Sequence, residues 1–406
     1  MPTRLRKAAL AFIFITVLLD MLALGVTIPV LPKLILGFKG GDSARAAAVY
    51  GAFGTVFAAM QFFFAPILGA VSDRFGRRPA ILLSNLGLGL DYILMAMAPS
   101  LAWLFLGRTI SGICAASFSV PSAYIADVTP LEKRAAGYGL LGAAFGLGFV
   151  IGPAFGGLLG DVNPRLPFWI AAGLSLANAC YGFFILPESL PPEKRAPFAW
   201  SRANPVGSFV LLRKYPEVWA IAVVAFFSYL AHEVLPSMWV LYTDYRYHWS
   251  AKMVGITLAV VGVFSAVVQG GLIRKGVAAM GERRALWFGL LCGAAGFALY
   301  GLAPTPWIFS MGIPLGALWG FAGPSAQALM SQRVDPTEQG RLQGALAGLR
   351  GISGMIGPTV FTSIFAWSIG PRAPKPMPGA PFLLAAALLL AAFLLALATT
   401  GRPSKT

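Results

Sequence analysis

Long apolar runs alternate with short charged, proline-containing or glycine-containing stretches along the whole chain. Most runs hold about 20 to 30 residues, and a helix needs about 20 to cross a hydrocarbon core roughly 30 Å thick. The pattern therefore predicts membrane-spanning helices. Their expected ranges are 8–31, 46–71, 79–99, 101–126, 136–160, 166–186, 218–242, 253–273, 285–303, 306–330, 342–369 and 380–399.

One long polar stretch divides this pattern near its middle. Residues 187–216 carry seven charged side chains, whereas the other interruptions between apolar runs are short. Six helices are expected on each side of it. The sequence thus predicts an all-α membrane protein of twelve transmembrane helices, with an N-terminal six-helix bundle at 1–186, a cytoplasmic linker at 187–216 and a C-terminal six-helix bundle at 217–406.

The two halves repeat short sequence elements at a nearly constant offset. Each repeated element opens or interrupts a predicted helix at the same point in its half. The paired positions are Gly76 and Gly281, Pro130 and Pro336, and Pro153 and Pro358. A duplicated six-helix unit is typical of transporters that bind their substrate between two rocking halves near the middle of the membrane.

Composition and charge agree with this interpretation. Hydrophobic residues make up 57% of the chain and charged residues 11%, whereas soluble proteins carry roughly 25% charged residues. The net charge of +16 does not indicate nucleic-acid binding, because the basic residues lie in short loops between apolar runs. Of the 31 Lys and Arg, 21 fall in loops on the side of the N-terminus and eight in the opposite loops. This bias predicts an inner (plasma) membrane protein with both termini in the cytoplasm, surrounded by the lipid bilayer.

The loop after the second predicted helix reads GAVSDRFGRR over residues 69–78. Its first glycine permits close helix approach, Gly76 permits a tight turn, and Asp73 with three arginines offers switchable charge pairs. The ten residues resemble the signature loop of the major facilitator superfamily, which implies the major facilitator fold; ordinary positive-inside topology is the alternative. The expected cytoplasmic gate comprises Gly69, Asp73, Arg74, Gly76, Arg77, Arg78, Asp127 and Arg134.

Glycines in the fifth predicted helix recur every fourth residue, so they share one ridge on which another backbone can pack closely. The run around them resembles the antiporter motif of the superfamily, which implies exchange rather than uniport; plain tight packing is the alternative. The residues concerned are Gly148, Gly152, Pro153, Gly156 and Gly157.

Asp20, Asp91 and Arg108 interrupt apolar helices of the first half. A carboxylate inside the membrane is costly and marks a candidate site for carrying a proton, with an arginine as its natural partner. A purely structural polar cluster is the alternative. In the second half the polar candidates are His232, Glu233, Gln269 and Gln327, with Arg350 either in the path or reaching towards the interface.

Longer stretches, from Asp20 to Pro32, from Tyr124 to Gly157 and from His248 to Gly344, resemble the tetracycline/proton antiporters of the drug-exporter branch. This resemblance covers nearly the whole chain and implies proton-coupled export of amphipathic drugs, with a functional role for Asp20, Asp91 and Arg108. It also implies a monomer that needs no cofactor besides the proton gradient, and a small-molecule substrate that could travel as a magnesium chelate. These exporters carry an acidic residue where this chain has Gly293.

Two alternatives to drug export follow from the residues. The same scaffold could transport an endogenous metabolite. A membrane-embedded enzyme would need a nucleophile, base or metal constellation, but the chain has only two histidines and no HExxH or P-loop spacing. We therefore expect neither an enzyme nor a metal site.

Overall fold

Every regular element that the structure describes is a helix. The computed structural model describes residues 3–115, 119–130, 133–198, 209–371 and 373–400. Helices satisfy their backbone hydrogen bonds internally, which a lipid environment requires. Ten helical stretches in the described residues are long and apolar enough to cross a membrane. The predicted all-α, multi-pass membrane fold is confirmed.

Contacts divide the chain into two compact units. The first comprises Met1–Gly40, Val56–Asn204 and Ser250–Ala259, and the second comprises Gly41–Thr55, Pro205–Trp249 and Val260–Thr406. Each unit thus takes most of its residues from one half of the sequence and a short segment from the other. The domain boundaries expected around 187–216 stay a prediction, and residues 199–208 of that linker lie outside the described residues.

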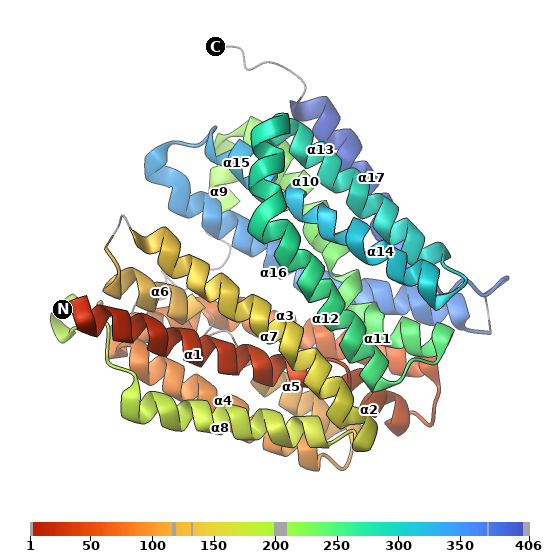
Figure 1. Ribbon diagram of the computed structural model, residues 1–406, viewed down its shortest axis with the longest axis horizontal. Helices are drawn as coiled ribbons and strands as arrows, with labels where there is room; N and C mark the ends of the chain where they lie inside the picture. Colours follow the sequence, from red (N-terminus) through yellow and green to blue (C-terminus); the bar gives the residue numbers. More distant parts are fainter. Residues whose placement is uncertain (1–2, 116–118, 131–132, 199–208, 372, 401–406) are drawn as a thin grey trace. The chain divides into compact units, whose positions relative to one another are not determined.

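The helices of the first half follow the predicted apolar runs. They are α1 (Thr3–Thr27), α2 (Leu31–Phe38), α3 (Ser43–Phe75), α4 (Arg77–Met97), α5 (Leu101–Ala115), α6 (Ser119–Val128), α7 (Arg134–Val162) and α8 (Leu166–Ile185). In the first unit α1 packs between α7 and α8, and α4 packs along α8 (Figure 1). The run expected at 101–126 is covered by α5 and α6, and residues 116–118 between them lie outside the described part.

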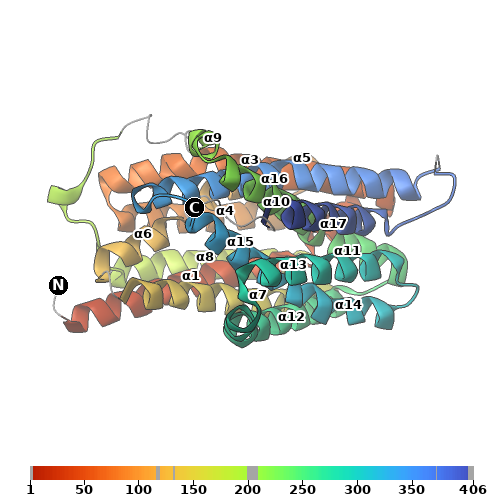
Figure 2. The same ribbon diagram turned by 90° about the horizontal axis from the view of Figure 1, so that it is seen from above.

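The second half contains more breaks than the sequence pattern predicts. Its helices are α9 (Val210–Lys214), α10 (Pro216–His232), α11 (Val234–Tyr247), α12 (Ala251–Val267), α13 (Ile273–Leu302), α14 (Pro306–Leu318), α15 (Ala322–Ser331), α16 (Gln339–Ile369) and α17 (Ala380–Thr400). In the second unit α13 packs against α14 and α17, and α10 packs against α16 and α17 (Figure 2).

Two of these breaks correct the predicted boundaries. The run 218–242 is broken at Glu233, and the run 306–330 is broken by the 3₁₀ turn Trp319–Phe321. In the polar stretch expected between 273 and 285, the π-helical turn Val268–Leu272 leads directly into α13, and Gly281, with φ of 76° and ψ of 160°, separates two helical segments within it. The charged residues beside it keep helical geometry, and the break lies at Gly281.

Two glycines confirm that the repeat in the sequence is also a repeat of the backbone. Gly76, before α4, has φ of 109°, and Gly281, inside α13, has φ of 76°. Both values lie in the region that side chains with a Cβ atom rarely adopt, so glycine is required for these turns. The two half-sequences therefore change direction at equivalent positions by the same means.

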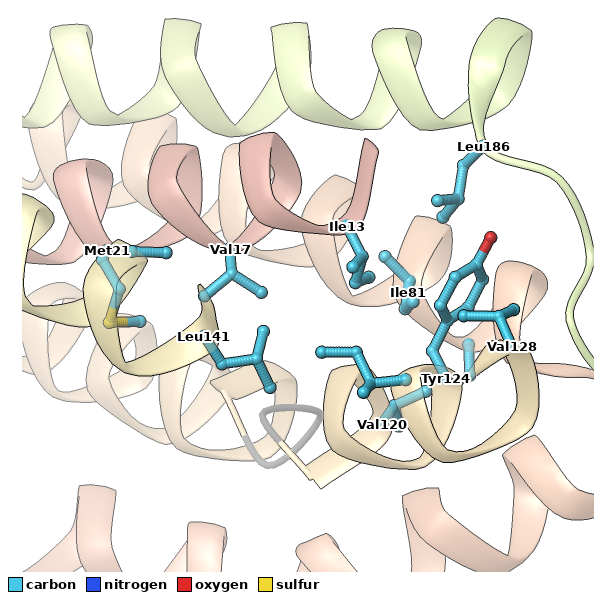
Figure 3. Close-up of a cluster of buried hydrophobic side chains, with 12 residues drawn as sticks. Ile13, Val17, Met21, Ile81, Val120, Tyr124, Val128, Leu141 and Leu186 are labelled. Carbon is cyan, nitrogen blue, oxygen red and sulfur yellow. The ribbon is translucent and has the colours of Figure 1, made fainter. Parts of the chain in front are cut away.

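A buried apolar core of the first unit lies where α1, α4, α6 and α7 meet (Figure 3). Val17 on α1, Ile81 on α4 and Leu141 on α7 are all buried there. Tyr124 on α6 is also fully buried, and its hydroxyl donates a hydrogen bond to the carbonyl oxygen of Pro187 over 3.0 Å. The start of the linker is thus fixed to the core of this unit.

The glycines at 148, 152 and 156 of α7 form a ridge that lets α1 approach closely. A Cβ atom added at Gly152 would lie 2.8 Å from the Cα atom of Gly25 on α1, and one added at Gly156 would clash with the backbone of Val26. On the neighbouring face, a Cβ atom at Gly157 would clash with the carbonyl oxygen of Ala251 at the start of α12. The ridge thus requires glycine for packing, whatever its part in exchange.

Replacing Gly156 by alanine is expected to destabilise the protein by about 1–3 kcal/mol, because the added methyl group overpacks the contact between α7 and α1. Gly146→Ala is the matched control on the same helix, since nothing lies within 4 Å of a Cβ atom at that position. The control should be neutral or slightly stabilising, as alanine favours helix. Thermal unfolding in detergent micelles measures both; equal melting temperatures would contradict the close contact.

Candidate functional site

The first unit brings the three predicted charges of the first half together. Asp20 lies on α1 and is 7% exposed, and Asp91 lies on α4 and is 1% exposed. Tyr92, the buried neighbour of Asp91, interacts electrostatically with Asp20, Asp91 and Arg108. The three residues, far apart in sequence, therefore form one polar cluster inside the helices of this unit.

Asp20 is held by one side chain from α8. The Asn178 amide nitrogen donates to the Asp20 Oδ1 atom over 2.8 Å and to the Thr16 carbonyl oxygen over 2.9 Å. A carbonyl oxygen can only accept, so this second bond fixes which end of the amide faces Asp20. The fully buried Asn178 therefore offers Asp20 a donor, which suits a carboxylate oxygen. Sequence reasoning missed Asn178, although it interrupts an apolar helix just as Asp20 does.

Asp91 has one satisfied oxygen and one unsatisfied oxygen. The Ser111 hydroxyl on α5 donates to Oδ2, whereas Oδ1 is buried without a hydrogen-bond partner in the described part of the chain. Arg108, also on α5, interacts electrostatically with Asp91, and its guanidinium group lies 4.2 Å from the ring centroid of Phe57. A buried carboxylate oxygen without a donor is a position where a proton removes an otherwise costly charge.

The second unit brings together His232, Glu233 and Arg350. His232 and Glu233 lie at the break between α10 and α11, and both interact electrostatically with Arg350 on α16. The Arg350 guanidinium group lies 4.8 Å from the ring centroid of Tyr229 on α10, rather than reaching away from this cluster. The Trp319 ring packs against the His232 ring, with 5.7 Å between the ring centroids.

The two predicted glutamines of the second half lie elsewhere. Gln327 on α15 is exposed and donates to the Gln343 side chain on α16 over 3.1 Å. Gln269 is exposed in the π-helical turn Val268–Leu272. Such turns are rare and occur often at functional sites, so Gln269 remains a candidate independent of the His232 cluster.

Three of the predicted gate residues meet at one ion-pair network in the first unit. The Arg77 guanidinium group bonds to Asp73 over 2.5 Å and to Asp127 on α6 over 3.1 Å. Ser189, from the linker, donates to the same Asp127 oxygen over 3.1 Å. Arg77 is only 11% exposed in its side chain, so this network is shielded enough to be stronger than a surface pair.

The remaining predicted gate residues do not join this network. Arg74 lies over the Phe75 ring, and Arg78 lies over the Phe183 ring and donates to the Phe183 carbonyl oxygen. Arg134 donates to the carbonyl oxygen of Ala126 over 2.9 Å. Gly69 makes no close contact that a Cβ atom would disturb. Arg74, Arg78 and Arg134 thus make local contacts near helix ends rather than joining the central ion pair.

Glu188 is a residue of this region that the sequence pattern did not single out as part of the site. Its Oε1 atom accepts from the backbone nitrogen atoms of Arg77 and Leu190, each over 2.9 Å, and its Oε2 atom accepts from that of Arg78 over 3.2 Å. The carboxylate therefore caps the N-terminus of α4 from 110 residues away, where free N–H groups and the helix dipole favour negative charge.

The other end of the linker is anchored in the second unit. The Lys214 ammonium group and the Tyr215 hydroxyl both donate to the Glu338 Oε2 atom over 2.7 Å. These hydrogen bonds hold the pKa of the Glu338 carboxyl below its usual range, and the bond to Glu338 raises the pKa of Lys214. Each described end of the linker is therefore fastened by one carboxylate, Glu188 at its start and Glu338 at its end.

A family model described as the Major Facilitator Superfamily matches residues 13–358, which is most of the chain. The chain belongs to the Major Facilitator Superfamily. Membership identifies this protein as a membrane transporter and not an enzyme, as the sequence predicts.

Known relatives of this major facilitator protein agree with the predicted branch. The tetracycline resistance protein, class C, of Escherichia coli is 41% identical over 360 residues, covering 89% of this chain and 90% of that protein. The class D protein of Salmonella ordonez is 37% identical over 367 residues, with 89% and 90% covered. The structure of the human organic anion transporter MFSD10 (TETRAN) is 25% identical, with a TM-score of 0.72, 98% of this chain covered and 100% of that chain.

Removing the Glu188 carboxylate is expected to weaken the start of α4. Glu188→Ala should lower stability by about 1 kcal/mol, the usual cost of losing a helix cap, and should speed hydrogen exchange at the amides of Arg77 and Arg78. Glu193→Ala, at an exposed carboxylate in the same linker, is the matched control. Hydrogen exchange followed by mass spectrometry distinguishes them; equal protection of the first turn of α4 would contradict the cap.

Proposed function

We propose that this transporter exports amphipathic organic compounds in exchange for protons, with tetracycline-like molecules as the first candidates. The observation that carries this proposal is the buried cluster of Asp20, Asp91 and Arg108 inside a major facilitator chain. Ionisable side chains at membrane depth are rare because they are costly, and they mark proton and substrate pathways in transporters. The names of the bacterial relatives supply the substrate class.

The two carboxylates of the cluster differ in how their oxygen atoms are hydrogen-bonded. Asp20 accepts a hydrogen bond from Asn178, whereas the Oδ1 atom of Asp91 is buried with no hydrogen-bond donor in the described part of the chain. In the proposed cycle, a proton entering from outside binds this polar cluster and is released to the cytoplasm as the drug leaves. Arg108 compensates charge when the carboxylates are ionised, and no further cofactor is required.

The proposed arrangement in the membrane has twelve spans and cytoplasmic termini. The stretch Ala251–Leu302 counts as one candidate span but has 52 residues, about 78 Å at 1.5 Å per residue, which is enough to cross twice. The broken stretch from Pro306 to Ser331 adds a further span of α14 and α15. With the other nine this gives twelve, and the Lys and Arg bias places both termini in the cytoplasm of an inner (plasma) membrane.

In this proposal the protein holds no metal ion of its own, and magnesium would enter only as part of a chelate with the drug. Among the described residues there is no group of three His, Cys, Asp or Glu side chains that could hold a metal ion. The site that is acidic in the resembled exporters is Gly293 here, buried among apolar side chains. We therefore propose that a monomer binds the organic molecule itself, with magnesium at most bound to the drug.

The test is uptake of tetracycline driven by a pH gradient, in proteoliposomes that contain the purified full chain. With an imposed pH gradient, the wild type is expected to accumulate tetracycline, and Asp20→Asn and Asp91→Asn should each reduce gradient-driven uptake about tenfold or more, equivalent to at least ~1.4 kcal/mol. Asp161→Asn, at an exposed position near the end of α7, should transport normally. Gradient-driven uptake that survives in both variants would overturn the assignment of the proton site.

A further inference from the structure

A tryptophan fills the space that a side chain at position 293 would need. A Cβ atom added at Gly293 on α13 would lie 2.8 Å from the Cγ atom of Trp319 and 2.7 Å from a methyl carbon of Leu389 on α17. Any side chain at this position would therefore displace the indole ring. The Trp319 ring thus occupies space that the side chain of a carboxylate residue at position 293 would need.

Two contacts fix the orientation of the Trp319 ring. Its backbone starts the 3₁₀ turn Trp319–Phe321, where α14 ends, and its indole nitrogen donates to the Ser228 hydroxyl on α10 over 3.1 Å. The buried Phe297 ring packs against it at 5.5 Å with an angle of 67° between the planes. The ring thus contacts α13 through Phe297 and α10 through Ser228, and these two contacts limit its rotation.

The exposed neighbour of this ring is His232. The two ring centroids are 5.7 Å apart and the planes are inclined by 36°; His232 is exposed and Trp319 partly buried. His232 lies at the middle of the candidate span Pro216–Tyr247, so the pair is at membrane depth. Glu233 and Arg350 place one charge of each sign beside it.

We infer that Trp319 and His232 form a stacking platform that binds the planar fused-ring part of the transported molecule and sets substrate preference. Rigid aromatic rings recognise planar molecules through stacking with little dependence on their substituents, and ligand sites combine such rings with a few charged groups that fix orientation. Glu233 and Arg350 would contact ionisable groups at the edge of the bound rings. The substrate class is a planar polycyclic compound with polar edges.

This inference rests on the proposed export function but is tested by binding rather than by proton coupling. Equilibrium binding of tetracycline and of a planar acridine dye, without magnesium, is measured on purified full-length protein in nanodiscs. Trp319→Leu is expected to weaken binding of both compounds about 3- to 10-fold, and Trp319→Phe, which keeps a ring, by a smaller factor. Trp307→Leu, which removes a tryptophan that is 81% exposed, should leave the binding constants unchanged.

A second variant keeps Trp319 and moves it. Gly293→Ala should displace the indole and weaken binding of the planar compounds to a similar extent, whereas Gly340→Ala, where nothing lies within 4 Å of an added Cβ atom, should not. Melting temperatures show which variants are folded. Unchanged binding in folded Trp319→Leu and Gly293→Ala proteins would overturn the platform and leave the export function standing. A wild type that neither binds nor transports any planar compound would overturn both.

Discussion

Asp20 and Asp91 lie where water cannot solvate them, and the arrangement of the first unit depends on how the fold accommodates them. Each receives one hydrogen bond from another helix, Asp20 from Asn178 on α8 and Asp91 from Ser111 on α5. The cost of burying a carboxylate falls when it is hydrogen-bonded or when it takes up a proton. The proposed proton exchange requires a cluster that is stable in more than one protonation state, and hydrogen bonding and proton uptake each lower the cost of burying these carboxylates.

The duplicated scaffold carries different chemistry in its two halves. Gly76 and Gly281 turn the backbone in the same way, yet the second unit has no counterpart of Asp20, Asp91 or Arg108 at the repeated positions, where Phe226, Phe297 and Pro314 stand. It presents aromatic rings instead, with His232, Trp319 and Phe297 in contact. Under the proposed function, the first unit would bind the proton and the second unit would bind the rings of the transported molecule.

The length of the apolar runs predicted nearly every membrane-spanning stretch, because a membrane span depends mainly on a local property, its hydrophobic length. The glycine at position 76 was also predictable, since its role is set by its own backbone. Asn178 and Glu188 were not recognised as site residues because their partners lie 158 and up to 111 positions away. For Gly293, the sequence shows only that a carboxylate is missing. The packing shows in addition that Trp319 fills the space of the missing side chain.

The glycine ridge of α7 and the proton site are mechanically linked through α1. Gly148 packs directly against Met21, the residue next to Asp20, while the opposite side of α1 is bonded through Thr16 and Asp20 to Asn178. A close-packed contact transmits strain, so a shift of α7 would press on α1 beside Asp20. Such a shift would change the distance between Asn178 and Asp20. Close packing at glycine thus gives the proposed proton exchange a physical route by which a helix movement would reach Asp20.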